Sequence, residues 1–325
     1  MTAARHDHGL GVACVLGASI LWGTTGTASA LAPTVPPLAV GSASMGFGGL
    51  LLAATSAPRI VRSRSQVARS WRLVAIGALA VLVYALAFYT SMRLAGVAVG
   101  TAVSIGGAPV AAALLERILD GRRLSGRWAA GAALGIAGAV VLCLARGGVP
   151  SDAAAGAAAS GEAAQTVAGV ALGAVAAASY ALYSFTSHRL IRAGLSSRAA
   201  VGATFGVAAL GLLVVLAATG GALLESWRNV AVGAYLAGIP MFLGYILFGW
   251  GLSRVSASTA TTVSLAEPVV AAALAVAVVG ERLPILGWFG MVLIVGCLAV
   301  LTLPLPDWSR RRRRGFGPAE AEAEG

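Results

Sequence analysis

Two stretches of the chain share a pattern that decides its fold. Residues 109–124 read PVAAALLERILDGRRL, and residues 268–283 read PVVAAALAVAVVGERL. Sliding the sequence on itself by 159 residues places the proline, the glycine and the Arg-Leu pair of the first stretch on those of the second. A shift of 158 residues likewise places residues 11–13 on residues 169–171, both Gly-Val-Ala. A repeat near half of the chain length indicates two homologous halves.

Each half contains five long apolar stretches. The chain is 58% hydrophobic and 11% charged, with a mean hydropathy of +0.86, which lies outside the range of soluble globular proteins. Short alternating strands of a membrane barrel are absent, so the stretches are expected to cross the bilayer as helices. The ten predicted spans are Leu10–Leu31, Pro37–Ala57, Leu73–Met92, Val97–Leu115, Trp128–Ala145, Val167–Ser187, Ala199–Thr219, Ala231–Leu252, Ala257–Val279 and Ile285–Leu303.

The basic residues sort onto alternate sides of these spans. All 23 are arginines, and with the N-terminus in the cytoplasm the division is 19 inside against 4 outside. The outside arginines are Arg93, Arg146, Arg228 and Arg282. This asymmetry is the positive-inside pattern of a polytopic membrane protein, and it predicts that both termini are cytoplasmic.

Five spans per half is an odd number, so the second half enters the membrane upside down relative to the first. The predicted fold class is therefore an all-α integral membrane protein with ten transmembrane helices arranged as two inverted five-helix repeats. We expect the first repeat at residues 9–145, an external Ala/Gly/Ser-rich linker at residues 146–166 and the second repeat at residues 167–304. Residues 305–325 are expected to form a cytoplasmic basic and acidic tail.

Other classes of protein fit the sequence poorly. Cys14, Cys143 and Cys297 fall inside spans without CxxC spacing, so neither a metal site nor a cofactor is expected. The arginines that give the net charge of +11 lie at the ends of the spans, where they meet lipid headgroups. Nucleic acid is therefore not an expected partner. A chain without lysine has no nucleotide-binding P-loop. The first span resembles a signal peptide, but Leu10–Leu31 is longer than the usual apolar core, and its removal would spoil the repeat.

A family resemblance rests on motifs in both halves. The motifs are Trp22-Gly23, Pro109 followed by Gly121-Arg122-Arg123-Leu124, and Glu267-Pro268 followed by Gly280-Glu281-Arg282-Leu283. Together with the five-plus-five plan, they resemble the EamA-like branch of the drug/metabolite transporter superfamily. The resemblance implies a ten-helix carrier of the inner (plasma) membrane, commonly an exporter of amino acids or related small metabolites. Two positions depart from the family pattern: Arg122 replaces a usual glutamate, and Ser44 replaces a frequent arginine. The second departure argues against an anionic substrate held by that arginine.

Glu267 is the acidic residue that stands out within a span. It lies about ten residues into the ninth span, after a series of hydroxyl residues that ends at Ser264. The following Pro268 has no backbone N–H and is expected to interrupt the helical hydrogen bonds. One interpretation is a carboxylate that pairs with a substrate amine or carries a coupling proton. The other is a protonated structural carboxylate, hydrogen-bonded to a neighbouring helix.

Further candidates lie deep in their spans. Buried indole and phenol groups need polar partners, which favours a cavity wall for Trp22, Tyr84 and Tyr180, whereas Tyr89 and Trp250 are expected in the interfacial belt. Pro109 and Pro268 occupy equivalent positions and predict paired hinges, with ordinary membrane-helix prolines as the alternative. The complete set of substrate or coupling candidates is Glu267, Trp22, Tyr84, Tyr180, Thr24, Ser104 and Ser264.

The expected function is that of a secondary-active transporter, exporting amino acids or related small metabolites by alternating access. The expected partners are a small-molecule substrate, the lipid bilayer and, as one source of energy, protons. The alternatives are an importer of another small metabolite and a non-transporting membrane sensor or assembly protein. An intramembrane enzyme is not expected, because it would need paired catalytic groups at one membrane depth and Glu267 has no such partner in the sequence.

Overall fold

The computed structural model describes residues 2–95, 97–121, 124–147, 159–274, 276–277 and 284–302, and all secondary structure within these residues is helical. The α-helices of the first half are α1 Thr2–Ala30, α2 Pro37–Arg62, α3 Arg64–Arg69, α4 Trp71–Ala95, α5 Val97–Asp120 and α6 Gly126–Gly147. Those of the second half are α7 Ala159–Arg192, α8 Ser197–Thr219, α9 Trp227–Leu236, α10 Gly244–Leu252, α11 Ala257–Val263, α12 Ala266–Leu274 and α13 Ile285–Thr302. Between them lie the 3-10 helix η1 (Gly221–Leu224) and the π-helical segment η2 (Ala237–Leu243).

Seven helical segments among the described residues are long and apolar enough to cross a membrane. They are Asp7–Ala30, Pro37–Arg62, Trp71–Ala95, Ala164–Arg192, Ser197–Thr219, Trp227–Leu252 and Ala257–Leu274. Two shorter apolar helices, Gly126–Val141 and Ile285–Leu301, accompany them. The prediction of an all-helical, multi-pass membrane protein is therefore confirmed.

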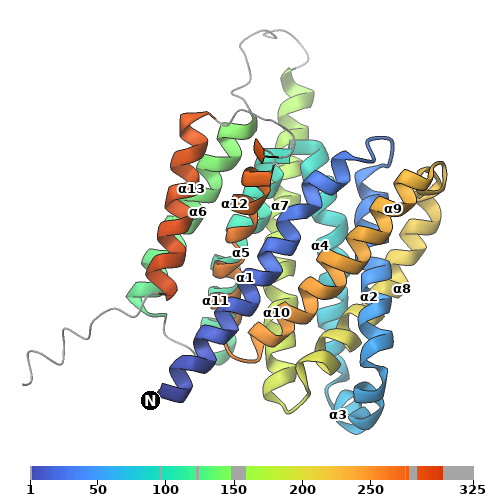
Figure 1. The fold of residues 1–325 in the computed structure, drawn as a ribbon, viewed down its shortest axis with the longest axis vertical. Helices are drawn as coiled ribbons and strands as arrows, with labels where there is room; N and C mark the ends of the chain where they lie inside the picture. The colour runs from blue at the N-terminus through green and yellow to red at the C-terminus, as the bar shows by residue number, and fades with distance from the viewer. Residues whose placement is uncertain are drawn as a thin grey trace, which may run out of the picture.

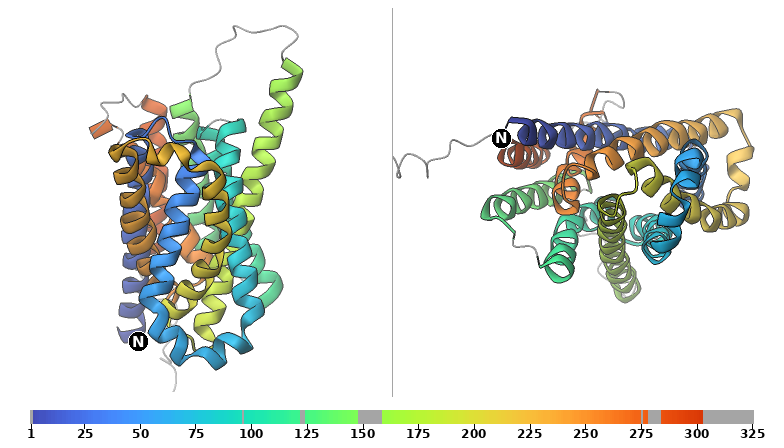
Figure 2. Two further views of the ribbon diagram at one scale, coloured as in Figure 1. Left: turned by 90° about the vertical axis from the view of Figure 1, so that its right-hand side faces the viewer. Right: turned by 90° about the horizontal axis from the view of Figure 1, so that it is seen from below.

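The long helices run side by side in one bundle (Figures 1 and 2). Helices α6 and α13 pack together at one edge, and α2 packs with α8 at the other. Helix α1 lies between them against α10 and α12, while α4 packs along α7. Each half thus contributes one helix to the major contacts, so the two halves interlock rather than forming separate lobes.

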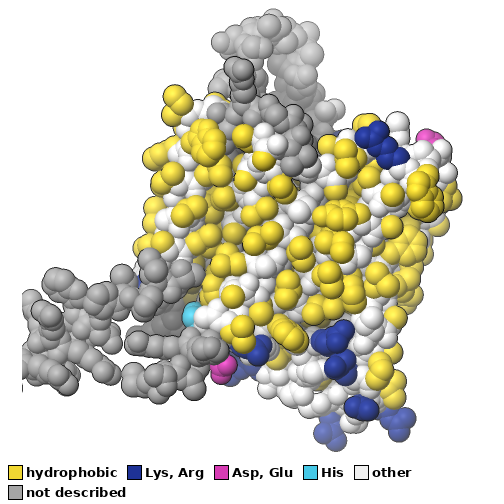
Figure 3. Space-filling view, in the orientation of Figure 1, with side chains coloured by type: hydrophobic (Ala, Val, Ile, Leu, Met, Phe, Trp, Pro, Cys, Tyr) yellow, Lys and Arg dark blue, Asp and Glu magenta, His cyan; other side chains and the backbone are white. Residues whose placement is uncertain are grey.

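The arginines gather at one end of the bundle, where α1 begins and α3 lies (Figure 3). We call this the arginine-rich end. Arg59, Arg62 and Arg69 lie in the last turns of α2 and α3, and Arg189 and Arg192 in the last turn of α7. The opposite end carries Arg93 in the last turn of α4 and Arg228 in the first turn of α9. The helix directions therefore reproduce the division of charge that the sequence predicts.

Prolines interrupt two of the spans, whereas other helices continue through a proline. Pro240 lies in the π-helical segment η2, which separates α9 from α10 and was not anticipated from the sequence. The ninth predicted span breaks at Ser264 and Leu265, where the Glu267 N–H donates to the Ser264 carbonyl at 2.9 Å. Pro268 cannot donate to the carbonyl four residues earlier, which explains the break. Helix α5, in contrast, continues through Pro109.

The segment between the halves is partly helical. Helix α7 begins at Ala159, inside the stretch expected to be linker. The residues there include several alanines together with Glu162 and Gln165, all good helix formers, which allows the helix to extend beyond its apolar part. The rest of the expected linker, residues 148–158, and the expected tail lie outside the described residues.

Candidate functional site

A cavity opens in the middle of the bundle between the two halves. Its volume is about 40 Å³, so in this conformation the walls lie close together and leave room for little more than water. Helices α1, α2 and α4 of the first half and α7, η2, α10 and α12 of the second supply its walls. The lining residues are Trp22, Thr25, Met45, Tyr84, Phe88, Tyr89, Tyr180, Tyr183, Met241, Tyr245 and Glu267.

The position of Trp22 depends on two glycines that permit close helix packing. A Cβ atom on Gly23 would lie 2.7 Å from Val270 Cβ and 3.1 Å from the Glu267 carbonyl oxygen. A Cβ atom on Gly244 would lie 2.7 Å from the Trp22 indole nitrogen. Small residues at such contacts let membrane helices approach each other closely. Gly23 therefore brings α1 against α12, and Gly244 leaves room for the indole beside α10.

Glu267 enters the cavity from the first turn of α12, directly after the break in the ninth span. Its side chain is half-buried, and among the described residues that line the cavity it is the only charged one. The hydroxyl groups that precede it mostly bond to carbonyls of α11: Thr262 donates to Ser258 at 2.7 Å, and Ser264 donates to Thr261 at 2.8 Å. They therefore stabilise the polar helix that leads to Glu267.

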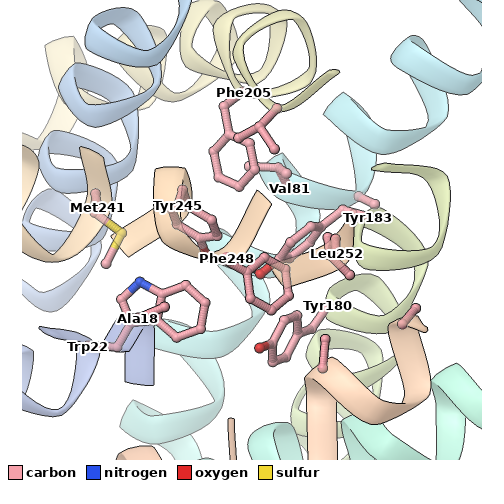
Figure 4. Packing of buried hydrophobic residues seen from close by; sticks show 14 of the residues in the cluster. Ala18, Trp22, Val81, Tyr180, Tyr183, Phe205, Met241, Tyr245, Phe248 and Leu252 are labelled. Carbon is pink, nitrogen blue, oxygen red and sulfur yellow. Dashed lines mark hydrogen bonds between the residues drawn. The ribbon is translucent and has the colours of Figure 1, made fainter. Parts of the chain in front are cut away.

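Aromatic rings line the cavity together with this carboxylate. Several of them, including Trp22, Tyr180 and Tyr245, pack in one cluster (Figure 4). The ring centroids of Tyr84 and Tyr180 are 5.6 Å apart, and those of Tyr180 and Tyr183 are 5.2 Å apart. Trp22 lies 5.0 Å from Tyr245 by the same measure. These separations are typical of favourable aromatic contacts. The rings come from α1, α4, α7 and α10, so the wall forms only when both halves are packed.

Hydrogen bonds hold several of the rings in place. The Tyr180 hydroxyl donates to Ser264 Oγ at 2.9 Å, and the hydroxyls of Tyr183 and Tyr245 lie 3.2 Å apart. In contrast, the Trp22 indole N–H and the Thr25 hydroxyl are buried without a hydrogen-bond partner among the described residues. Buried polar groups in proteins are usually satisfied. These two groups are therefore available to a ligand in the cavity.

The structure brings some of the predicted site residues together and separates others. Trp22, Tyr84, Tyr180 and Glu267 all line the cavity, and Ser264 contacts it through its bond to Tyr180. Three of the remaining candidates, Thr24, Ser104 and the predicted hinge Pro109, are not among the lining residues, and neither is the second predicted hinge, Pro268.

These three residues have other surroundings. Thr24 donates to the Leu21 carbonyl at 2.7 Å and accepts from the Tyr235 hydroxyl at 2.9 Å. Ser104 is buried in α5, and its hydroxyl has no partner among the described residues. Pro109 is buried in the same helix. A place in the substrate site is therefore supported less well for these residues than for those that line the cavity.

The sequence reasoning missed part of the cavity wall. Tyr89 was expected in the interfacial belt, but it lines the cavity because its ring packs on Gly41, whose added Cβ would lie 2.3 Å away. Phe88 follows the predicted Tyr84 by four residues, so a helical i, i+4 pattern could have found it. The other lining residues that were not predicted are Thr25, Met45, Tyr183, Met241 and Tyr245.

A second buried carboxylate was also missed, because the fourth span was expected to end just before it. Glu116 is 2% exposed and lies in α5 toward the arginine-rich end. Its two carboxylate oxygens accept from the Ser258 N–H at 3.0 Å and from the Ser258 hydroxyl at 2.8 Å. Glu116 therefore accepts hydrogen bonds from the first turn of α11, the helix that precedes Glu267 in the chain.

Comparison with known proteins agrees with this architecture. The sequence pattern of the EamA-like transporter family matches residues 9–144 and again residues 167–303. The chain is 32% identical over 293 residues to the uncharacterized transporter YwfM of Bacillus subtilis (strain 168). The alignment covers 89% of this chain and 93% of that protein. A crystal structure of a protein 23% identical in sequence aligns with a TM-score of 0.69, over 94% of this chain and 99% of the other. This last similarity concerns the fold alone.

Proposed function

The chain belongs to the EamA-like transporter family, and from this premise we propose that it is a secondary-active exporter of amino acids or related small metabolites. The observation that carries the proposal is the cavity between the halves, which has one carboxylate, Glu267, among aromatic walls. Sites at the interface of two repeats are the usual place for a substrate in secondary transporters. Closing the cavity on one side and opening it on the other would then move the substrate across the membrane.

The proposed architecture has ten transmembrane helices in two inverted repeats. The seven segments long and apolar enough to span, the two shorter apolar helices and α5 support this number. The two matches to one family pattern support the repeats. In Figure 1, α1 runs away from the arginine-rich end and α7 runs toward it, as inversion requires. We place this end in the cytoplasm of the cell that carries the protein in its plasma membrane, because cytoplasmic loops collect arginine.

In the proposed mechanism, Glu267 either pairs with the amino group of the substrate or carries the proton that is exchanged for it. A carboxylate in a partly apolar cavity is stabilised by a positive partner and is costly without one. Pro268 supports this role, because the helix break before it positions Glu267 at the cavity wall. Trp22, Tyr84 and Tyr180 would form the binding surface, and Ser264 would orient Tyr180.

The experiment that tests the proposal compares wild-type protein with Glu267→Gln in proteoliposomes. A screen of metabolite toxicity and efflux in cells with and without the protein first supplies the transported solute. We expect Glu267→Gln to preserve folding and insertion, because the amide has nearly the size of the carboxyl, and to abolish gradient-coupled flux of that solute. Flux is measured over a range of external pH at matched amounts of protein.

The matched control is Glu225→Gln, since Glu225 is exposed between η1 and α9 and lies outside the cavity. This variant should retain the rate and pH profile of the wild type. If Glu267→Gln also retains both, Glu267 is a structural carboxylate and the proposed mechanism is wrong. If the toxicity and the efflux of every solute are the same in cells with and without the protein, the protein is not an exporter. Uptake assays then decide whether it is an importer.

A further inference from the structure

We propose that the cavity selects small organic monocations, namely protonated amines that carry a neutral hydrogen-bond acceptor and no carboxylate. Amides and other derivatives of amino acids in which the carboxyl group is replaced by an uncharged group belong to this class, whereas amino acids do not. The inference rests on the proposed transport function and narrows its substrate from amino acids and related metabolites to those relatives of amino acids that have no carboxylate.

The charge of the cavity is the first argument. In the part of the chain that the structure describes, Glu267 is the one charged residue of the lining, which contains neither arginine nor histidine. An ionised Glu267 and a protonated amine form a neutral pair, which removes the cost of an isolated charge in a poorly hydrated site. An amino acid would add a second carboxylate to the same cavity. The site would then contain two negative groups and one positive group, with no basic side chain in the lining to balance them.

The position at which a basic partner could stand carries serine instead. Ser44 is buried in α2, and its hydroxyl donates to the Gly41 carbonyl at 3.1 Å. It lies one residue before the cavity residue Met45. Serine there offers no charge to a carboxylate.

The aromatic walls are the second argument. Tyr84, Tyr180 and Tyr245 belong to one set of rings with centroids about 4–6 Å from their neighbours, and all three line the cavity with Glu267. Ring faces attract cations, and this attraction is strongest where water is excluded. The same faces repel a carboxylate, which their quadrupole disfavours. Both the carboxylate and its aromatic surroundings therefore favour an ammonium group.

The unsatisfied donors are the third argument. Trp22 is 5% exposed, and its indole N–H can only donate a hydrogen bond. Neither it nor the Thr25 hydroxyl has a partner among the described residues, and both residues line the cavity. A ligand that brings a neutral carbonyl or hydroxyl oxygen would satisfy one of them. A simple amine would leave both without a partner from the ligand.

The test uses four compounds that share one phenyl ring and differ in charge. They are phenylalanine (zwitterion), phenylalaninamide (cation with an acceptor), 2-phenylethylamine (cation without one) and 3-phenylpropionate (anion). Each competes with the solute found in the efflux screen for transport by full-length protein in proteoliposomes, at about pH 6.5, where α-amino groups are protonated. We expect the amide to inhibit at concentrations at least tenfold below phenylalanine, with 2-phenylethylamine between them and the anion inactive.

A variant separates the role of the indole N–H. Trp22→Phe keeps an aromatic ring and removes the donor, so most of the advantage of the amide over 2-phenylethylamine, which is the contribution of one hydrogen bond, should be lost. Thr25→Val, which removes the other donor, is measured in parallel in case Trp22→Phe does not fold. Trp250→Phe is the control, because Trp250 is 48% exposed and outside the cavity, and the ratio should not change.

Two results would overturn the inference while leaving the transport function intact. One is inhibition by phenylalanine equal to or stronger than inhibition by its amide. The other is no inhibition by either cation while the protein transports a solute of another class. The proposed function fails separately, when the protein moves no solute in the efflux screen or in proteoliposomes.

Discussion

Glu116 permits a quantitative prediction about how the two halves are held together. Glu116→Ala removes both acceptors of Ser258, a residue 142 positions away in the other half. Hydrogen bonds to a charged group contribute about 1.5–3 kcal/mol each, but side-chain hydrogen bonds in membrane proteins average about 0.6 kcal/mol with a maximum near 1.7. Both of these bonds are buried, so we expect a combined loss of about 2–3 kcal/mol in the free energy of unfolding.

The measurement is unfolding of purified protein by SDS in mixed micelles, which reports the free energy change. Glu116→Gln keeps one acceptor oxygen and should lose about half as much, while Glu225→Ala on the exposed loop should be neutral. In a double-mutant cycle with Ser258→Ala, the coupling should be about 1–2 kcal/mol. A loss below about 0.5 kcal/mol for Glu116→Ala together with zero coupling would show that this contact does not hold α5 to α11.

Three further predictions concern movement, packing and orientation. Pro109→Ala or Pro268→Ala should reduce flux in proteoliposomes more than it reduces the amount of folded, inserted protein, and unchanged flux in both variants would make the prolines passive. Gly41→Ala should displace the Tyr89 ring, whose nearest carbon would lie 2.3 Å from the new Cβ, and weaken substrate competition several-fold. Gly26→Ala, which meets nothing within 4 Å, is its control, and equal competition in the two variants would refute the role of the ring. A reporter that works only in the cytoplasm should be active when it is fused to either terminus. Activity at either terminus of a reporter that works only on the outer side of the membrane would contradict the proposed orientation.

The general plan of the molecule could be predicted because it depends on properties that each stretch of the chain has by itself. Apolar length and the cost of an unpaired backbone in lipid dictate helices, and the sorting of arginines follows the ends of those helices. The break before Glu267 was also visible, since a proline removes a hydrogen bond wherever it occurs. Trp22, Tyr84, Tyr180 and Glu267 were selected for their depth within spans, and depth does bring them near one another.

The rest was decided by how the helices are rotated and how closely they approach. Tyr89 lines the cavity only because Gly41 on another helix leaves room for its ring, and Thr24 misses the cavity although Thr25, its neighbour in sequence, lines it. Rotation about a helix axis depends on the partners of the whole bundle, which no local pattern records. The contact of Glu116 with Ser258 belongs to the same class, because it joins residues from different halves. The sequence by itself therefore determined that the apolar segments are helices and which charges lie at their ends. Only the tertiary structure decided which side chains share one cavity, since that depends on contacts between distant helices.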